Sequence, residues 1–377
     1  MLKAAVLSVT LLAAAAQAQS PQTYPDLPVA IKNGVGGLIG NTIYVGLGTA
    51  GQKVYALDLS AGERQWREVA TFPDAPREQA VAGVVGGKLY VFGGVGKGSP
   101  EATTAVFNQV HVYDPASNAW TLLNTRAPRE IAGGVATVQG DQILLFGGVN
   151  KNIFDGYFKD LAAAGSDPAR SAAVARAYFE QRAQNYFFGQ DVEAYTPATN
   201  TWQSLGTLPF EGRAGAALVN QNGTLTVING EIKPCLRSSS VKQGTLQGGS
   251  LQWRNLPNLA RPAGGSVQDG LAGAFAGTSH GALLVTGGAN FPGSNARYAA
   301  GNLYAHEGLT KTWHGDVYAL REGRWTVVGQ LPQPQGYGLS VQHGNELILV
   351  GGELKGGTAS AGVFSLELDG NTVKVRD

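Results

Sequence analysis

The stretch VVGGKLYVFGG, residues 84–94, decides the fold. Gly86-Gly87 predicts a tight turn between two short apolar strands, and Gly93-Gly94 ends the second strand, because glycine readily adopts the positive φ angles of such positions. The segment VHVYDP at 110–115 predicts a third strand, and Trp120 marks a fourth. A single antiparallel sheet of this size cannot bury both of its faces, so it needs neighbouring sheets.

The same order of signals returns along the chain. A second clear copy occupies 138–148, 192–197, 200–202 and 208–209, and weaker copies lie within 38–66, 218–253, 283–325 and 346–375. A double glycine followed by a tyrosine and a tryptophan, at intervals of about 50 residues, is typical of kelch repeats. We therefore expect an all-β, six-bladed kelch-type β-propeller whose tyrosine and tryptophan side chains fill the space between sheets. Residues 24–30 are expected to supply the strand that closes the ring.

Two insertions interrupt the repeats, at about 150–189 in the third blade and about 289–315 in the fifth. The first is expected to be helical, because Asp167-Pro168 is an N-cap followed by proline at the first helical position. Good helix formers follow from Ser171 to Gln184. Such an insertion covers one mouth of the channel, contacts a partner or simply decorates the surface, and the sequence leaves these alternatives open.

The N-terminus has the pattern of a secretory signal peptide. Lys3 precedes an apolar run over 4–16, and Ala16-Gln17-Ala18 is a small-x-small cleavage site. We expect cleavage after Ala18, with the propeller spanning 19–377. The one cysteine of the chain, Cys235, cannot form an internal disulfide, and export without disulfides suits a bacterial periplasm.

Composition excludes several classes of partner and cofactor. The chain has 54 glycines among 377 residues, 43% hydrophobic residues and a net charge of +1. This near-neutral balance predicts neither nucleic-acid nor membrane binding. The sequence contains no G-x-S-x-G nucleophile elbow, and its five histidines are scattered. We therefore expect no metal and no other cofactor.

The candidate site residues depart from the repeat pattern or lie where loops converge on the central channel. In the fourth blade, Asn229-Gly230 replaces the double glycine, and Glu231 follows with Arg237 nearby. A carboxylate at this position could act as a general base and the guanidinium could bind a carboxylate substrate, although an ordinary ion pair in a loop has the same spacing.

Two further groups of residues are weaker candidates. The long loop of the fifth blade combines amide, aromatic, imidazole and carboxylate side chains suited to a sugar, or it packs on itself. Arginines at blade starts either line the channel or bind backbone carbonyls within the repeats. The residues concerned are Asn290, His306, Glu307, Arg77, Arg129 and Arg213.

Three motifs together resemble one family. NGEIKP at 229–234 followed by Arg237, GGANFPG at 287–293 and YAHEGL at 304–309 are similar to the bacterial N-acetylneuraminate epimerases, also called sialic acid mutarotases. The resemblance implies a periplasmic homodimer that interconverts the α and β anomers of N-acetylneuraminic acid without a cofactor. It also implies that Glu231 is the proton acceptor and that Arg237 binds the substrate. Cys235 stands between them, where a small residue is expected.

Two other functions stay open from the residues alone. One is a non-catalytic kelch propeller that binds a glycan or a protein. The other is a kelch enzyme with different chemistry on another acidic sugar. A mutarotase changes the anomeric ratio but not the mass of its substrate, so anomer exchange separates the three hypotheses.

Overall fold

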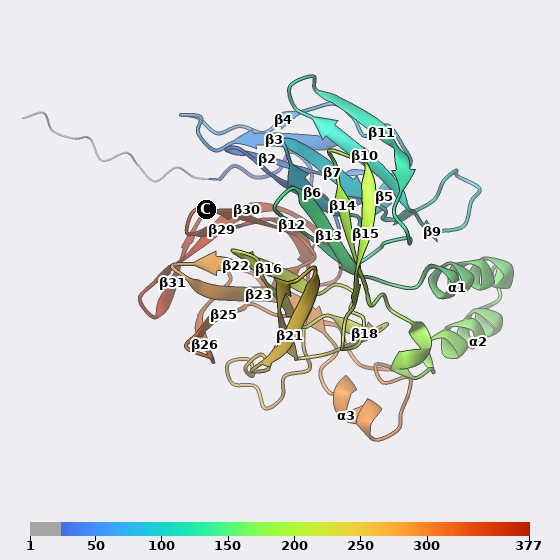
Figure 1. Cartoon of the computed structure of the whole chain (residues 1–377). Helices are drawn as coiled ribbons and strands as arrows, with labels where there is room; N and C mark the ends of the chain where they lie inside the picture. Colours follow the sequence, from blue (N-terminus) through green and yellow to red (C-terminus); the bar gives the residue numbers. More distant parts are fainter. Residues whose placement is uncertain (1–23) are drawn as a thin grey trace, which may run out of the picture.

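The computed structural model describes residues 24–377. The predicted signal peptide and its cleavage site lie outside the described residues. Within them, six antiparallel sheets contain four or more strands each, and they follow one another along the chain around a common centre (Figure 1). The predicted all-β propeller class is confirmed.

Each of the first three sheets is built from four strands. The first contains β1 (Val35–Ile39), β2 (Thr42–Gly46), β3 (Val54–Asp58) and β4 (Arg67–Glu68). The second contains β6 (Val81–Val85), β7 (Lys88–Phe92), β10 (Gln109–Asp114) and β11 (Ala119–Arg126). The third contains β12 (Gly134–Gln139), β13 (Gln142–Gly147), β14 (Asp191–Thr196) and β15 (Thr201–Thr207).

The other three large sheets follow the same plan. The fourth contains β16 (Ala217–Gln221), β17 (Thr224–Ile228), β20 (Val241–Gln247) and β21 (Ser250–Leu256). The fifth contains β22 (Ala272–Ser279), β23 (Ala282–Asn290), β24 (Thr312–Trp313), β25 (Asp316–Arg321) and β26 (Arg324–Gln330). The sixth contains β27 (Gln335–Gly336), β28 (Leu339–His343), β29 (Glu346–Leu354), β30 (Ala359–Asp369) and β31 (Thr372–Arg376).

The hydrophobic core lies between the sheets. Six clusters of buried side chains each join two neighbouring sheets, and the cluster of the first and sixth sheets completes the circle. The repeated tryptophans cross these seams: the indole of Trp120 donates to the carbonyl of Ala70 at 2.9 Å, and that of Trp325 donates to the carbonyl of Pro257 at 2.9 Å. The predicted role of tryptophan between sheets is thereby confirmed.

A ring of six backbone hydrogen bonds surrounds the central axis. In each sheet, one residue at or just before the start of the innermost strand donates its N–H to the carbonyl of the equivalent residue in the preceding sheet, at 2.7 to 3.0 Å. All six residues have φ between 54° and 67°; they are Asn33, Gln79, Gly133, Gly215, Gly273 and Tyr337. The bond from Asn33 to the carbonyl of Tyr337 joins the first sheet to the sixth and so closes the ring.

The expected closure by a strand from residues 24–30 is wrong. These residues form no strand, and the sixth sheet takes all of its strands from residues 335–376. The segment nevertheless packs on that sheet, because the N–H groups of Leu27 and Ile31 donate to Ala361 and Ser360 of β30. The sixth sheet forms all five of its strands from its own repeat, so the N-terminal segment covers the seam instead of extending the sheet.

The helices belong mainly to the two insertions. The first insertion contains α1 (Lys151–Ala164), α2 (Pro168–Phe179) and the 3₁₀ turn η2 (Ala183–Tyr186), and the second contains α3 (Ser294–Ala299). The predicted cap is confirmed: Asp167 accepts hydrogen bonds from the N–H groups of Ala169 and Arg170, and Pro168 begins α2. All three α-helices lie on the same side of the ring of sheets (Figure 1). A further 3₁₀ turn, η1 (Gly48–Ala50), lies in the first sheet.

Two small sheets complete the structure. One consists of β5 (Arg77–Glu78), β8 (Val95–Gly96) and β9 (Ala105–Val106). The other is the hairpin of β18 (Glu231–Lys233) and β19 (Leu236–Arg237), which interrupts the fourth large sheet between β17 and β20. Among residues 24–377, no helix has both the length and the apolar character needed to cross a membrane.

Candidate active site

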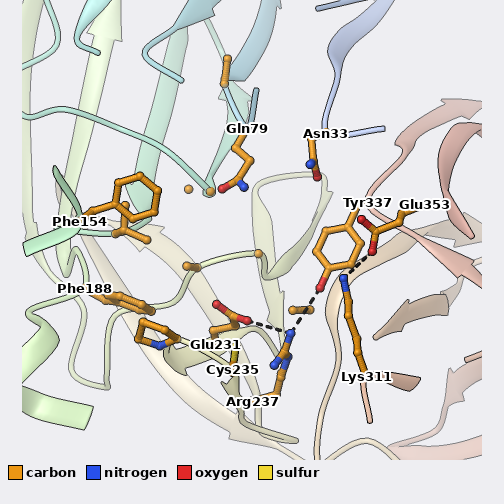
Figure 2. A pocket seen from close by; sticks show the side chains of 18 of the residues that line it. Asn33, Gln79, Phe154, Phe188, Glu231, Cys235, Arg237, Lys311, Tyr337 and Glu353 are labelled. Carbon is orange, nitrogen blue, oxygen red and sulfur yellow. Dashed lines mark hydrogen bonds and ion pairs between the residues drawn. The ribbon is translucent and has the colours of Figure 1, made fainter. Parts of the chain in front are cut away.

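A cavity of about 480 Å³ lies on the axis of the propeller, beside the hydrogen-bonded ring (Figure 2). Residues from the inner ends of all six large sheets line it, so the cavity belongs to the whole ring. The hairpin β18–β19 and both insertions form the rest of its wall. Glu231 and Arg237 both face this cavity, as the sequence predicts.

The hairpin places Glu231 and Arg237 side by side. The two residues are directly paired across β18 and β19, and paired residues of an antiparallel ladder lie on the same face. Pro234 and Cys235 form the turn, and Cys235 has φ 66°, the left-handed conformation that glycine usually takes at such a position. The backbone of Glu231 is also fixed by two hydrogen bonds to Ala214, of 2.7 and 3.1 Å.

A bulge at Ile232 turns Lys233 to the opposite face of the hairpin. Lys233 pairs with Leu236 while Glu231 pairs with Arg237, so one extra residue stands in β18. The Lys233 side chain is buried, and its Nζ donates to the carbonyls of Phe179 at 2.8 Å, Gln181 at 2.7 Å and Leu303 at 2.5 Å. One face of the hairpin thus carries the site, and the other anchors both insertions.

Glu231 and Arg237 form a largely desolvated ion pair. The Oε1 atom of Glu231 lies 2.9 Å from Nη2 of Arg237, whose side chain is 3% exposed. Burial alone would lower the pKa of Arg237, but the charge of Glu231 raises it above its ordinary value. The Nε and Nη1 atoms of Arg237 have no hydrogen-bond partner among residues 24–377. Unpaired buried donors are costly, so these atoms are suited to an anionic ligand.

Tyr337 and an ion-pair cluster form the opposite wall. Nη2 of Arg237 donates to the hydroxyl of Tyr337 at 3.4 Å. Lys311 lies over the Tyr337 ring, 4.5 Å from its centroid, and is paired with Glu353. Glu353 also binds Lys32 at 3.0 Å. This wall presents a hydroxyl and a cation whose positions are fixed by other side chains (Figure 2).

Aromatic side chains give the cavity an apolar side. Phe154 and Phe188 come from the first insertion and Phe291 from the second, and all three line the cavity. The guanidinium of Arg237 lies 5.0 Å from the centroid of the Phe291 ring. Such faces suit the C–H surfaces of a sugar, while the opposite wall suits its polar groups.

The other residues predicted from the sequence lie outside this cavity. The blade-start arginines contact the backbone of their own repeats: Nη1 of Arg77 donates to the carbonyl of Gly93, and Nη1 of Arg213 donates to that of Asn229. Gly93 and Asn229 occupy equivalent strand ends, so this is a repeated structural contact. Arg129 lies 3.9 Å from Glu193, beside the third sheet.

Residues of the long fifth-sheet loop contact one another or the first insertion. Asn290 is buried and bonded to the carbonyl of Gly270 and to His314. The ring of His306 packs on Phe291, and burial lowers the pKa of His306 to about 4, so it is neutral at neutral pH. Glu307 forms an ion pair with Arg176 of α2. Among residues 24–377, no three histidine, cysteine or acidic side chains are grouped to hold a metal ion.

The comparisons agree with this arrangement. Residues 24–375 match the N-acetylneuraminate epimerase family. The chain belongs to this family. It is 49% identical to the N-acetylneuraminate epimerase of Haemophilus influenzae (strain PittEE) over 94% of both chains, and 50% identical to that of Yersinia pestis (strain Pestoides F) over 98% of this chain and 94% of that protein. The solved structure of YjhT has a TM-score of 0.89 and 40% identity, covering 94% of this chain and 99% of that one.

Sequence reasoning missed several polar residues of this epimerase-family cavity, including Gln79, Lys311 and Tyr337. Gln79 and Tyr337 stand two residues before the first residue of the innermost strands of their sheets, and two residues after Arg77 and Gln335. Position within the repeat could therefore have identified them, because equivalent positions of every blade meet at the axis. Lys311 lies in an insertion without a repeat register and could not have been found in this way.

Proposed function

We propose that this protein is an N-acetylneuraminate epimerase that interconverts the α and β anomers of its sugar by opening and closing the pyranose ring. The observation that carries the proposal is the Glu231–Arg237 pair, 2.9 Å apart, in a cavity on the propeller axis. Membership of the epimerase family and the named relatives support the same activity.

The chemistry needs only groups that this cavity contains. The anomeric carbon of N-acetylneuraminic acid carries a carboxylate, a hydroxyl and the ring oxygen. Arg237 pairs with the carboxylate, and Glu231 accepts the proton of the anomeric hydroxyl as the bond to the ring oxygen breaks and the ring oxygen takes up a proton, which it gives back on ring closure. The resulting keto acid rotates about its C2–C3 bond, and the ring oxygen then attacks the other face of the carbonyl. Glu231 returns its proton to the new anomeric hydroxyl, so the enzyme ends as it began.

The pairing of base and cation also explains how both can work in a desolvated site. A lone buried charge would be strongly destabilised, but each side chain offsets the charge of the other. When the substrate carboxylate binds, the two unpaired nitrogens of Arg237 gain an acceptor. Glu231 side-chain atoms remain 21% exposed, which leaves the carboxylate accessible from the cavity.

The deciding experiment is proton NMR of α-N-acetylneuraminic acid, freshly released by a sialidase. The C3 protons report the two anomers separately. We expect the wild-type protein to accelerate the approach to the equilibrium ratio, and Glu231→Gln to lose about 10²- to 10⁴-fold of the enzyme rate, the usual contribution of a general base. Glu68→Gln, at an exposed ion pair with Lys53, is the control and should behave as wild type.

Full activity in Glu231→Gln would remove this residue from the mechanism. A wild-type protein that binds the sugar without accelerating exchange would instead establish a binding module. Thermal unfolding of both variants shows whether the fold is intact.

We also propose that the protein is exported to the periplasm and acts there as a homodimer. The charged start, apolar run and Ala16-Gln17-Ala18 site support export, and the family resemblance supports the dimer. N-terminal sequencing of the exported protein should begin at Gln19, and sedimentation should give twice the mass of the mature chain. A retained Met1 or a monomeric mass would contradict the corresponding part of this proposal.

A further inference from the structure

The backbone of Tyr337 has a conformation that is unfavourable for a bulky residue. Its φ is 58°, in the left-handed region that bulky residues rarely adopt. Two bonds of the central ring fix this conformation: the Tyr337 N–H donates to Gly273, and the Tyr337 carbonyl accepts from Asn33, at 2.7 and 2.8 Å. Strained residues that are fixed in this way are concentrated at functional sites.

The hydroxyl of Tyr337 points toward Arg237 and Glu231 (Figure 2). Nη2 of Arg237 lies 2.9 Å from Glu231 Oε1 and 3.4 Å from Tyr337 Oη. One guanidinium nitrogen therefore joins the two oxygen atoms, and their separation cannot exceed the sum of these distances. In the bond to Tyr337 the arginine is the donor, so the phenolic proton is free for another acceptor.

We propose that Tyr337 is the proton donor to the ring oxygen of the sugar. This inference rests on the proposed epimerase function. The carboxylate, hydroxyl and ring oxygen of the substrate are all bonded to one anomeric carbon, and Glu231 and Tyr337 both contact the same nitrogen of Arg237. Each of the three side chains thus has one substituent to contact.

Every proton that moves in ring opening and ring closure is accounted for. On ring opening, Glu231 gains the proton of the anomeric hydroxyl, the C2–O6 bond breaks, and Tyr337 gives its proton to O6. The phenolate that results is stabilised by the adjacent Arg237 cation. On ring closure O6 returns its proton to Tyr337 as it attacks C2, and Glu231 protonates the carbonyl oxygen.

Other donors at the cavity are less suited to this step. The ammonium group of Lys311 forms an ion pair with Glu353 and lies 4.5 Å from the centroid of the Tyr337 ring, so its protons are already directed to another acceptor. Burial raises the pKa of the Cys235 thiol to about 11 and that of the Tyr337 phenol to about 12, so acidity does not separate these two donors. Cys235 differs in its place, since it stands at positive φ in the hairpin turn, whereas the Tyr337 hydroxyl accepts a hydrogen bond from Arg237. Tyr178 also lines the cavity, and its hydroxyl is therefore tested beside that of Tyr337.

The test compares exchange and binding in Tyr337→Phe. We expect kcat for anomer exchange to fall about 10²- to 10⁴-fold, because one general acid is lost. Affinity for the 2-O-methyl glycoside of N-acetylneuraminic acid, which cannot open its ring, should stay close to the wild-type value. Tyr195→Phe, which removes a hydroxyl bonded to Asn200 far from the cavity, is the matched control and should keep both properties.

A second variant keeps the Tyr337 hydroxyl but displaces the aromatic ring that carries it. A Cβ atom at Gly273 would lie 2.4 Å from Cδ1 of Tyr337, so Gly273→Ala should displace the ring and lower kcat as well. If wild type and Glu231→Gln behave as proposed but Tyr337→Phe retains the wild-type kcat, the inference fails while the epimerase function stands. Loss of activity in Tyr178→Phe alone would assign the proton to that residue. If wild type itself does not accelerate exchange, the proposed function has failed.

Discussion

Three non-glycine residues of the central ring adopt left-handed backbone angles: Asn33, Gln79 and Tyr337, with φ of 54°, 54° and 58°. A side chain in this conformation costs about 1 kcal/mol or more relative to glycine. All three line the axial cavity, whereas the other three ring positions are glycines. Stability alone would favour glycine at all six positions. The ring therefore keeps side chains where they face the proposed substrate, at the expense of backbone strain.

Another residue with an unusual environment, His111, lies within the second sheet. It is 1% exposed, its ring centroid is 4.6 Å from that of Phe72, and its Nε2 lies 3.6 Å from Asp74. Burial, with a contribution from Arg77, lowers the pKa of His111 to about 4. The folded protein thus holds a neutral imidazole where the unfolded chain would bind a proton below pH 6.5.

The free energy of unfolding should consequently fall as the pH drops from 6.5 to 4, since the unfolded chain binds more protons in that window. In His111→Phe, which keeps a ring against Phe72, the fall between pH 7 and pH 4.5 should be smaller by about 2 kcal/mol. Urea unfolding of both proteins at the two pH values measures the difference. An equal fall in both would show that His111 does not control acid stability.

At the scale of elements, the two insertions form one structure over the cavity. The ring of Phe179 in α2 stacks on Tyr304 of the second insertion, with centroids 5.2 Å apart, and the Tyr298 hydroxyl accepts from Ala183 N–H at 2.9 Å. Because Phe154 and Phe188 of the first insertion line the cavity, this insertion covers the channel mouth, one of the three alternatives that its sequence leaves open. Lys233 connects both insertions to the hairpin that carries Glu231.

Lys233→Met tests this connection, because methionine has a similar length but no donor. Three carbonyl groups would lose a charged donor, and we expect a loss of about 3 kcal/mol in the free energy of unfolding. Hydrogen exchange should rise in α2 and in the second insertion more than in the large sheets, and KM for the sugar should increase. Lys242→Met, which removes an exposed bond to Asn255, serves as the control. Unaltered hydrogen exchange in α2 would mean that the aromatic contacts alone hold the insertions in place.

These elements also show what the sequence could predict. The repeats predicted the propeller, and Asp167-Pro168 predicted the start of α2, because both signals are local. The closeness of Glu231 and Arg237 was predicted because they are six positions apart in the sequence, although the hairpin that pairs them was not. The ion pair of Glu307 with Arg176 did not, because it joins two insertions whose relative placement depends on the whole ring. The same holds for Lys311 and Glu353, which come from the fifth and sixth repeats.

At the scale of the whole molecule, the first and last repeats of residues 24–377 meet at the seam between the first and sixth sheets. Ile31 lies in the buried cluster of this seam and is 2% exposed. Its N–H donates to Ser360 and its carbonyl accepts from Gly352, at 2.9 and 2.7 Å. The indole of Trp66 donates to the carbonyl of Pro25 at 2.8 Å. At two other seams the equivalent tryptophan donates to a carbonyl that follows the preceding sheet, so the N-terminal segment supplies the acceptor at this seam. Closure thus depends on side-chain packing and single hydrogen bonds, without a shared strand.

Ile31→Ala should open this seam before any other. The backbone bonds can remain, but the lost side chain leaves a cavity between the sheets, and removal of a buried isoleucine costs about 2 to 5 kcal/mol. Hydrogen exchange should then rise first in β1 and in β28 to β30, while β13 and β17 stay protected, because each sheet contacts only its two neighbours. Leu122→Ala, at a side chain that is 49% exposed, should change stability by less than about 0.5 kcal/mol. A uniform rise in exchange across all sheets would instead mean that the ring unfolds as one cooperative unit and that its closing seam is no weaker than the rest.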